Sequence, residues 1–288
     1  MTMEFAVGRA SQKSPVKAYY ALEKPGQKWH IHGYITLIGC YLLMMFYTTV
    51  AGWMLHYFYL TATGKFTGLD SDAVASQFNT MLSQPQVMGF WMVIIVIAGI
   101  LVCSIGLQNG LEKVTKVMMI SLLFIMVILA INSFFMDGAK EGLSFYLIPD
   151  FERMKEIGII KTITGAMNQA FFTLSLGIGA MSIFGSYIGK ERSLLGESLN
   201  IALLDTFVAI TSGLIIFPAC FTFHVDQTSG PGLIFITLPN IFNHIPMGKL
   251  WGSLFFIFMS FAAFSTILAV FENIISCGME LTGWSRKK

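Results

Sequence analysis

The sequence predicts an all-α integral membrane protein, and both its composition and its hydropathy pattern support this fold class. The chain has 288 residues, of which 55% are hydrophobic and only 12% are charged. Soluble domains carry about 25% charged residues, so the composition excludes an ordinary soluble fold. Since a helix needs about 20 mainly apolar residues to cross a bilayer, six stretches are long enough to span it. They cover residues 33–60, 88–107, 117–135, 158–188, 199–223 and 250–277.

The basic residues predict on which side of the membrane the two ends of the chain lie. Several precede the first span, namely Arg9, Lys13, Lys17, Lys24 and Lys28. Arg286, Lys287 and Lys288 follow the last span. Cytoplasmic segments are enriched in Lys and Arg, and an even number of spans puts both ends on one side. We therefore expect a multi-pass protein of the plasma (inner) membrane, embedded in lipid, with both termini in the cytoplasm.

Several function classes lack support in the sequence. There is no basic cluster of the kind that binds nucleic acid. There is also no His-Glu-x-x-His motif and no Gly-x-Ser-x-Gly nucleophile elbow, so we do not expect an enzyme. His30 and His32 lack a third metal ligand nearby in the sequence, so we do not expect a metal site there. The four cysteines lie within or at the ends of apolar spans, which favours buried free thiols; they are Cys40, Cys103, Cys220 and Cys277.

Residues 171–180 (FFTLSLGIGA) predict that the helix of span 158–188 is broken. Each glycine of the Gly-x-Gly pair disfavours a helix by roughly 1 kcal/mol. Backbone groups freed within a bilayer need polar partners, and secondary transporters use such broken helices to bind ions and substrates. Phe172, Thr173 and Ser175 would then offer carbonyl and hydroxyl oxygens to a cation or an ammonium group. The alternative is a glycine kink that serves helix packing.

Asp205 is the second candidate, because it lies about two helical turns into span 199–223. An ionisable residue at that depth is costly and by default suggests a functional site. Oxygen ligands suit a hard cation, and we expect Asp205 and Thr173 to supply them. The alternative is a carboxylate near the cytoplasmic end that is hydrated or bonded to Thr206 or Asn200.

Polar side chains in two other spans are more ambiguous. Ser265 and Thr266 follow two alanines in span 250–277, where such hydroxyls often bond back to the preceding turn. Glu272 lies in the same span, and the sequence assigns it no ligand role. Tyr47 in span 33–60 needs a partner for its hydroxyl, which either another helix or a substrate carboxylate would supply. Outside the spans we expect a basic polar loop over residues 8–32, polar loops over residues 61–87 and 136–157, and a loop over residues 224–249 in which two short helices are hinged at Pro239.

Several motifs together resemble the neurotransmitter:sodium symporter family, in particular its bacterial members. They are residues 3–9 (MEFAVGR), Tyr47 with residues 50–53 (VAGW), residues 171–180, Asp205-Thr206 with Ser212-Gly213 and residues 216–218 (IFP), and residues 230–239 (GPGLIFITLP). The resemblance covers essentially the whole chain. It implies a partial inverted-repeat sodium-symporter fold with the break near residues 175–179. In the family's register, the chain would run from the end of the second transmembrane helix to the eighth.

The resemblance also implies a set of site residues. Thr173 and Asp205 match one sodium site, and Ala262, Ser265 and Thr266 match a second. The substrate-binding positions are Leu43, Tyr47, Phe172, Ser175, Ile178 and Val270. Among them, the Tyr47 hydroxyl would bind a substrate carboxylate and Phe172 would form the outer lid. Gln169 and Phe172 match the outer gate, Tyr187 matches the inner gate, and residues 224–249 match the extracellular lid.

The function that the resemblance implies is sodium-coupled symport of an amino acid by alternating access. The matching pocket positions are mainly apolar, so we expect a hydrophobic amino acid. Asp205 stands where animal members carry Asn, and Ala209 stands where chloride-dependent members carry Ser, so we expect a fixed carboxylate to replace chloride. No other cofactor is expected.

The family's first helix and those after the eighth would supply further ligands, and we expect the chain to need these missing helices for transport. Two alternatives remain open. One is a broken-helix carrier for another substrate class. The other is a free-standing six-span protein that acts as a regulatory or assembly partner.

Overall fold

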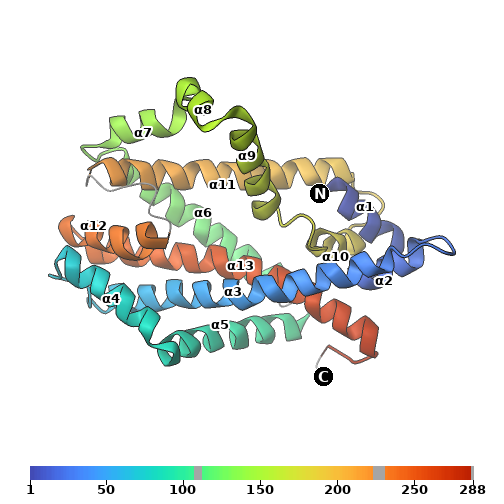
Figure 1. Cartoon of the computed structure of the whole chain (residues 1–288). Coiled ribbons are helices and arrows are strands. Elements are labelled where there is room, and N and C mark those ends of the chain that lie inside the picture. Colours follow the sequence, from blue (N-terminus) through green and yellow to red (C-terminus); the bar gives the residue numbers. More distant parts are fainter. Residues whose placement is uncertain (107–111, 223–230, 287–288) are drawn as a thin grey trace.

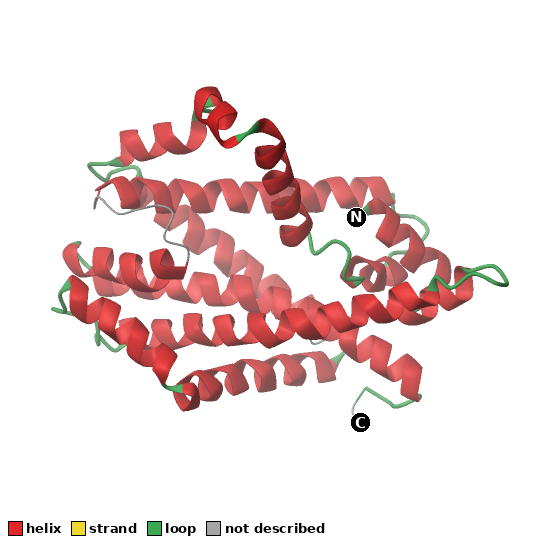
Figure 2. Ribbon diagram, in the orientation of Figure 1, coloured by secondary structure: helices red, strands yellow, loops and turns green. Residues whose placement is uncertain are grey.

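The computed structural model describes residues 1–106, 112–222 and 231–286, and within these ranges the chain is helical with short connections (Figures 1 and 2). Among the described residues, five helices are long and apolar enough to cross a membrane. They are α3 (His30–Ala62), α5 (Pro85–Ile105), α6 (Lys113–Ser133), α11 (Leu194–Thr222) and α13 (Gly248–Thr282). Each of them lies on one of the predicted spans, although residues 107 and 223 of those spans fall outside the described ranges.

The remaining predicted span, residues 158–188, is divided between two shorter helices. α9 (Ile159–Thr173) ends before the Gly-x-Gly pair, and α10 (Ala180–Tyr187) begins after it. Residues 174–179 between them are not helical, in agreement with the break expected from the sequence. The two halves point in different directions in Figure 1, where α9 descends from α8 and α10 lies beside α2.

The core of the molecule is the contact between α3 and α13, which run side by side across Figure 1 with α5 and α6 beside them. Helices in lipid associate through close packing, which small residues at the contact permit. Gly52 of α3 fits this rule, because a Cβ there would lie 2.8 Å from the backbone nitrogen of Met92 in α5. Gly252 of α13 similarly faces the side chains of Thr61 and Phe242.

An aromatic cluster closes one end of α3. α4 (Ser71–Ser83), a π-helical turn (Leu233–Thr237) and α12 (Leu238–His244) meet there. The ring of Phe235 stacks on Phe78 at 5.4 Å and meets the edges of Trp53 and Tyr57. α4 lies within the predicted polar loop over residues 61–87, where Asp70 caps it by accepting a hydrogen bond from the Ala73 nitrogen at 2.8 Å.

The expectation of a polar loop over residues 8–32 is wrong in part. α1 (Thr2–Ser11) extends into it, and α2 (Pro15–Leu22) lies entirely within it. α2 begins with a proline at its first position, where the absent N–H costs nothing, and it buries Val16 and Ala18. α1 lies against α10, where Gly8 approaches the backbone of Ser182 and Gly185 approaches that of Phe5.

The loop expected over residues 136–157 is partly helical as well. The described part of the lid region, where two short helices are expected, also contains helical segments. α7 (Ala139–Leu147) and α8 (Phe151–Ile157) form an arm with α9 at the top of Figure 1. Asp150 caps α8 by accepting a hydrogen bond from the Arg153 nitrogen at 2.9 Å. In the lid, the structure describes residues 231–249 of the predicted 224–249. Pro239, the expected hinge, lies in the first turn of α12, which directly follows the π-helical turn.

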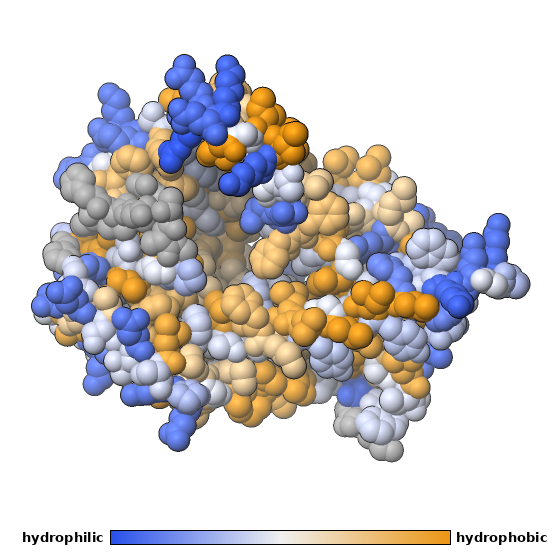
Figure 3. Space-filling model, in the orientation of Figure 1, coloured by the Kyte–Doolittle hydropathy of each residue, from blue (hydrophilic) through white to orange (hydrophobic). Residues whose placement is uncertain are grey.

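The surface pattern suits a chain that contacts lipid. Hydrophobic side chains gather over the middle of the face in Figure 3, and hydrophilic ones gather toward its ends and along the α7–α8 arm. On α3, the exposed fractions of Ile38, Leu42 and Met45 are 58%, 62% and 73%. Contiguous apolar surface on this scale is rare on soluble proteins.

The close crossing of α1 and α10 yields a prediction. Replacing Gly8 by Val would place a Cβ 1.8 Å from the Ser182 carbonyl oxygen, so α1 and α10 must separate. We expect the Gly8→Val variant to lose roughly 1–3 kcal/mol of stability, as is typical of overpacking. Thermal unfolding in detergent measures the loss. Gly89→Ala is the control, because nothing lies within 4 Å of a Cβ at Gly89. An equal effect of both variants would contradict the close crossing.

Candidate functional site

A cavity of about 770 Å³ lies where the broken helix faces α3, α6, α11 and α13. Eleven of the residues predicted for the sites line it: Leu43, Tyr47, Gln169, Phe172, Thr173, Ser175, Ile178, Asp205, Ala262, Ser265 and Thr266. These residues come from stretches of sequence more than 200 positions apart. The fold therefore brings the candidate ion, substrate and outer-gate positions to one place. Their individual roles stay predictions.

Two predicted site residues lie outside this cavity lining. Val270 is 1% exposed and packs in the hydrophobic core on α13. Tyr187, predicted for the inner gate, lies at the end of α10 and bonds to α13.

The break owes its shape to residues that adopt left-handed backbone angles. Ser175 has φ 51°, Gly177 has φ 87° and Gly179 has φ 74°. Glycine adopts these angles at no steric cost, whereas Ser175 is strained, and strained residues of this kind cluster at functional sites. The chain thus leaves the helix after Thr173 and enters α10 after Gly179 with several backbone groups free of helical bonds.

Thr173 and Asp205 form the polar centre of the cavity. The Thr173 hydroxyl lies 2.9 Å from Oδ1 and 3.2 Å from Oδ2 of Asp205, to which it donates. Thr206, the alternative partner of Asp205, instead donates to the Ala202 carbonyl at 2.7 Å. A hydroxyl oxygen and a carboxylate therefore lie together beside the break, and they form an oxygen-rich pair suited to a hard cation.

A second group of oxygens lies on α13. The hydroxyls of Ser265 and Thr266 both donate to the carbonyl of Ala262, at 2.8 Å and 3.5 Å. This is the back-bonding that the sequence favours for such hydroxyls. It also brings the three predicted ligands of the second sodium site onto one helical turn at the cavity wall. Each hydroxyl donates its hydrogen to Ala262, so its oxygen keeps lone pairs that can coordinate a cation.

The rest of the cavity wall is mainly apolar. Leu43 and Tyr47 project from α3, Phe172 lies just before the break, and Ile178 lies within it. Sequence reasoning missed further wall residues, namely Met119, Leu122, Asn168, Phe171, Leu176, Ile201, Leu204 and Val208. They lie in plain apolar helix or beside predicted positions, and hydropathy alone does not distinguish a wall residue from one that faces lipid. An apolar pocket with a few polar groups is the usual form of a small-molecule site.

Glu4 of α1 was also missed, although it belongs to a motif that carries the family resemblance. Its Oε1 accepts a hydrogen bond from the Gly177 nitrogen at 2.6 Å. A carboxylate thus satisfies one of the backbone donors that the break frees. Charge-assisted bonds of this kind are roughly twice as strong as neutral ones.

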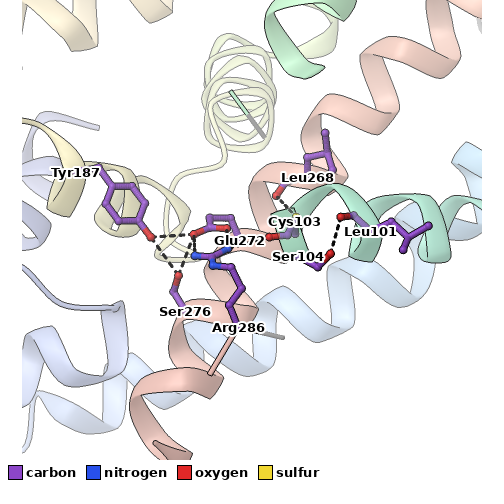
Figure 4. A network of polar contacts seen from close by, with 8 residues as sticks. All are labelled: Leu101, Cys103, Ser104, Tyr187, Leu268, Glu272, Ser276 and Arg286. Atoms are coloured by element: carbon purple, nitrogen blue, oxygen red, sulfur yellow. Dashed lines mark hydrogen bonds and ion pairs between the residues drawn. The ribbon is translucent and has the colours of Figure 1, made fainter. Parts of the chain in front are cut away.

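A polar network surrounds Glu272 on the side of α13 that faces α10 and α5 (Figure 4). Glu272 is fully buried, and Arg286 binds it through two hydrogen bonds of 2.6 Å and 2.7 Å. Tyr187 donates to the same carboxylate at 2.9 Å. Arg286 also donates to the Cys103 carbonyl at the end of α5, at 3.2 Å. These hydrogen bonds to Glu272 raise the pKa of the Arg286 guanidinium above its ordinary value.

The cysteines agree with the sequence-based expectation. Cys40, Cys103, Cys220 and Cys277 are all buried and free.

His30 contacts a carboxylate, with its Nδ1 2.8 Å from Oε1 of Glu23.

Comparisons with known proteins identify the family that the chain resembles. Residues 72–286 match the model of the sodium:neurotransmitter symporter family. The chain is 33% identical over 274 residues to the uncharacterized sodium-dependent transporter YhdH of Bacillus subtilis, covering 95% of this chain and 59% of that protein. It is 30% identical to an uncharacterized sodium-dependent transporter of Haemophilus influenzae, covering 90% of this chain and 57% of that protein.

The fold has a match among solved structures. The crystal structure of MhsT in complex with L-phenylalanine superposes with a TM-score of 0.89 at 36% identity, covering 99% of this chain and 64% of that one. The chain therefore spans about three fifths of the length of these relatives. With a family model matched over most of its length and a shared fold, the chain belongs to the sodium:neurotransmitter symporter family.

Proposed function

We propose that the chain forms the ion- and substrate-binding part of a sodium-coupled amino-acid symporter that works by alternating access. The observation that carries this proposal is the cavity at the broken helix, where the Thr173–Asp205 pair and Tyr47 share one apolar-walled space. A cation bound to the oxygens of Thr173 and Asp205 would lie beside the substrate in this space. Its charge would then favour the carboxylate of a bound amino acid, which is a direct physical route to coupling.

The apolar wall supports a hydrophobic amino acid as the substrate. Leu43, Phe172 and Ile178 offer no hydrogen bonds, so they favour an apolar side chain, while the Tyr47 hydroxyl suits the carboxylate. MhsT, which shares this fold, was solved with L-phenylalanine. Leucine-sized and aromatic side chains are both compatible with a cavity of this volume.

Transport by this chain requires segments that its longer relatives carry. α9 has no buried residue, and the exposed fraction of Phe172 at the cavity mouth is 60%. The two sodium sites proposed here hold two and three protein ligands, which is few for a bound cation. We therefore infer that further helices cover α9 and complete these sites. We also propose that the protein lies in the plasma membrane with both ends of this chain on the cytoplasmic side, because basic residues precede its first span and follow its last.

The Glu272 network is proposed as the closed inner gate. It joins α10, which follows the break, to α13 and to the end of α5, and it lies toward the end of the molecule where α2 and α10 meet (Figure 1). The aromatic cluster and α12 lie at the opposite end of α3. Opening toward the cytoplasm would then require the Tyr187–Glu272 bond to break.

The sodium proposal predicts the effect of an Asp205→Ala variant. Losing a charged ligand should raise the sodium concentration for half-maximal amino-acid uptake by roughly 10- to 100-fold, or abolish uptake. Uptake of radiolabelled hydrophobic amino acids into proteoliposomes containing the full-length gene product measures this shift. Asp72→Ala, at the exposed start of α4, is the matched control and should not change it. A normal sodium response in Asp205→Ala would rule out this residue as a ligand.

Chloride gives a second test. Since Asp205 supplies a fixed negative charge, uptake should be unchanged when gluconate replaces chloride. The double variant Asp205→Asn and Ala209→Ser removes the charge and adds a hydroxyl one turn away, so its uptake should become chloride-dependent. A strict chloride requirement in the unmodified protein would overturn the charge-replacement idea.

The gate proposal predicts the effect of Arg286→Ala. Removing Arg286 leaves the Glu272 carboxylate buried without its ion-pair partner, which typically costs 3–5 kcal/mol. We expect a large fall in the thermal unfolding midpoint, and partial recovery when Glu272→Gln removes the remaining charge. Arg192→Ala is the control, because Arg192 is 69% exposed in its pair with Glu197 and such pairs contribute at most about 1 kcal/mol. Equal effects of Arg286→Ala and Arg192→Ala would contradict the network.

A further inference from the structure

The carbonyl of Ile178, in the middle of the break, is held by two side chains from different helices. Cys40 of α3 donates its thiol hydrogen to this oxygen at 3.2 Å. Asn273 of α13 donates an amide hydrogen to the same oxygen at 3.4 Å. A carbonyl oxygen has two lone pairs, and here each has a donor. The two side chains therefore take the place of the helical N–H that the break removes.

The same side chains also bond to each other. The Asn273 amide lies 3.2 Å from the Cys40 sulfur, which accepts its second hydrogen. On the far side of Asn273, the Cys277 thiol lies 3.8 Å from the amide oxygen. The Ile178 carbonyl fixes which end of the Asn273 amide faces it, because only the amide nitrogen can donate to a carbonyl. Cys40, Asn273 and Cys277 thus form an ordered set of donors and acceptors.

The group is shielded from its surroundings. Cys40 is fully buried, and Asn273 and Cys277 are each 1% exposed. Solvent water therefore does not reach this group to replace a lost hydrogen bond. A buried carbonyl left without a partner lowers the stability of the fold. Gly179, the next residue, fits closely against Pro15 and Thr36, so the backbone has little room to turn the carbonyl elsewhere.

We propose that Cys40 and Asn273 are positioning residues, which fix the Ile178 carbonyl away from the cavity and thereby set the Ile178 side chain as a wall of the substrate pocket. The part concerning substrate rests on the symport function proposed above. The part concerning the backbone does not, because it follows from the hydrogen bonds alone.

Hydrogen exchange on the protein in detergent tests the backbone part. In Asn273→Leu and Cys40→Ala, amides of peptides covering residues 174–182 should exchange roughly tenfold faster than in the unmodified protein, since the break has lost a bond. Cys40→Ser retains a donor and should restore most of the protection. If Cys40 were needed only for packing, Cys40→Ser and Cys40→Ala would raise the exchange rate equally. Cys220→Ala is the matched control: this thiol is also fully buried, but it lies about 22 Å along α11 from Asp205. Unchanged exchange in both Asn273→Leu and Cys40→Ala, or no rescue by Ser, would overturn the proposal.

Equilibrium binding of radiolabelled leucine and phenylalanine to the full-length gene product tests the substrate part. Cys40→Ala and Asn273→Leu should raise the Kd roughly tenfold, and Cys40→Ser should return it toward the original value. Faster exchange with an unchanged Kd would overturn the pocket role of Ile178. If the unmodified protein binds neither amino acid while exchange changes as expected, the proposed substrate class fails and the positioning of the backbone stands.

Discussion

The structure depends on one constraint: a helix broken in apolar surroundings must find partners for the backbone groups that it frees. Residues 174–179 free such groups, and the partners come from three other helices. Glu4 of α1 accepts from Gly177, while Cys40 of α3 and Asn273 of α13 donate to Ile178. Each missing partner would cost roughly 1–3 kcal/mol, so the positions of α1, α3 and α13 around the break are linked to its conformation.

The backbone groups of the break that face the protein have hydrogen-bond partners there. The side of the break that faces the cavity can therefore remain open to a ligand. The Gly177 and Ile178 groups are bonded within the protein, whereas Thr173 and Ser175 line the cavity with Asp205 opposite. The break thus bonds the Gly177 N–H and the Ile178 carbonyl within the protein and presents the side chains of Thr173 and Ser175 to the cavity. Ser175, in its strained left-handed conformation, lies at the boundary between the two. Strain at this point is consistent with a segment shaped for binding as well as for stability.

The sequence predicted those features that depend on local pattern or on the family resemblance. The glycine pair located the break, and hydropathy located the long helices α3, α5, α6, α11 and α13. It missed α2 and α4, which are short helices in polar segments. α2 begins with a proline and buries Val16 and Ala18, whereas Asp70 caps α4 and one face of α4 is buried. It also missed the partners of the break and of Glu272. Glu4 and Gly177 are 173 residues apart, and Cys40 and Ile178 are 138 apart, so only the tertiary fold brings them together.

α13 connects the candidate sites, because successive turns of this one helix face different parts of the molecule. Ala262, Ser265 and Thr266 face the cavity, and the neighbouring residues Glu272 and Asn273 bond to Tyr187 and to Ile178. From Ala262 to Glu272 the helix rises about 15 Å, so a displacement at one point is carried to the other as a rigid-body movement. A rotation of α10 away from α13 would stretch the Tyr187–Glu272 and Asn273–Ile178 bonds together. The proposed inner gate and the proposed pocket wall would therefore be linked through α13, and a ligand that stabilises the wall would also favour the closed state of that gate.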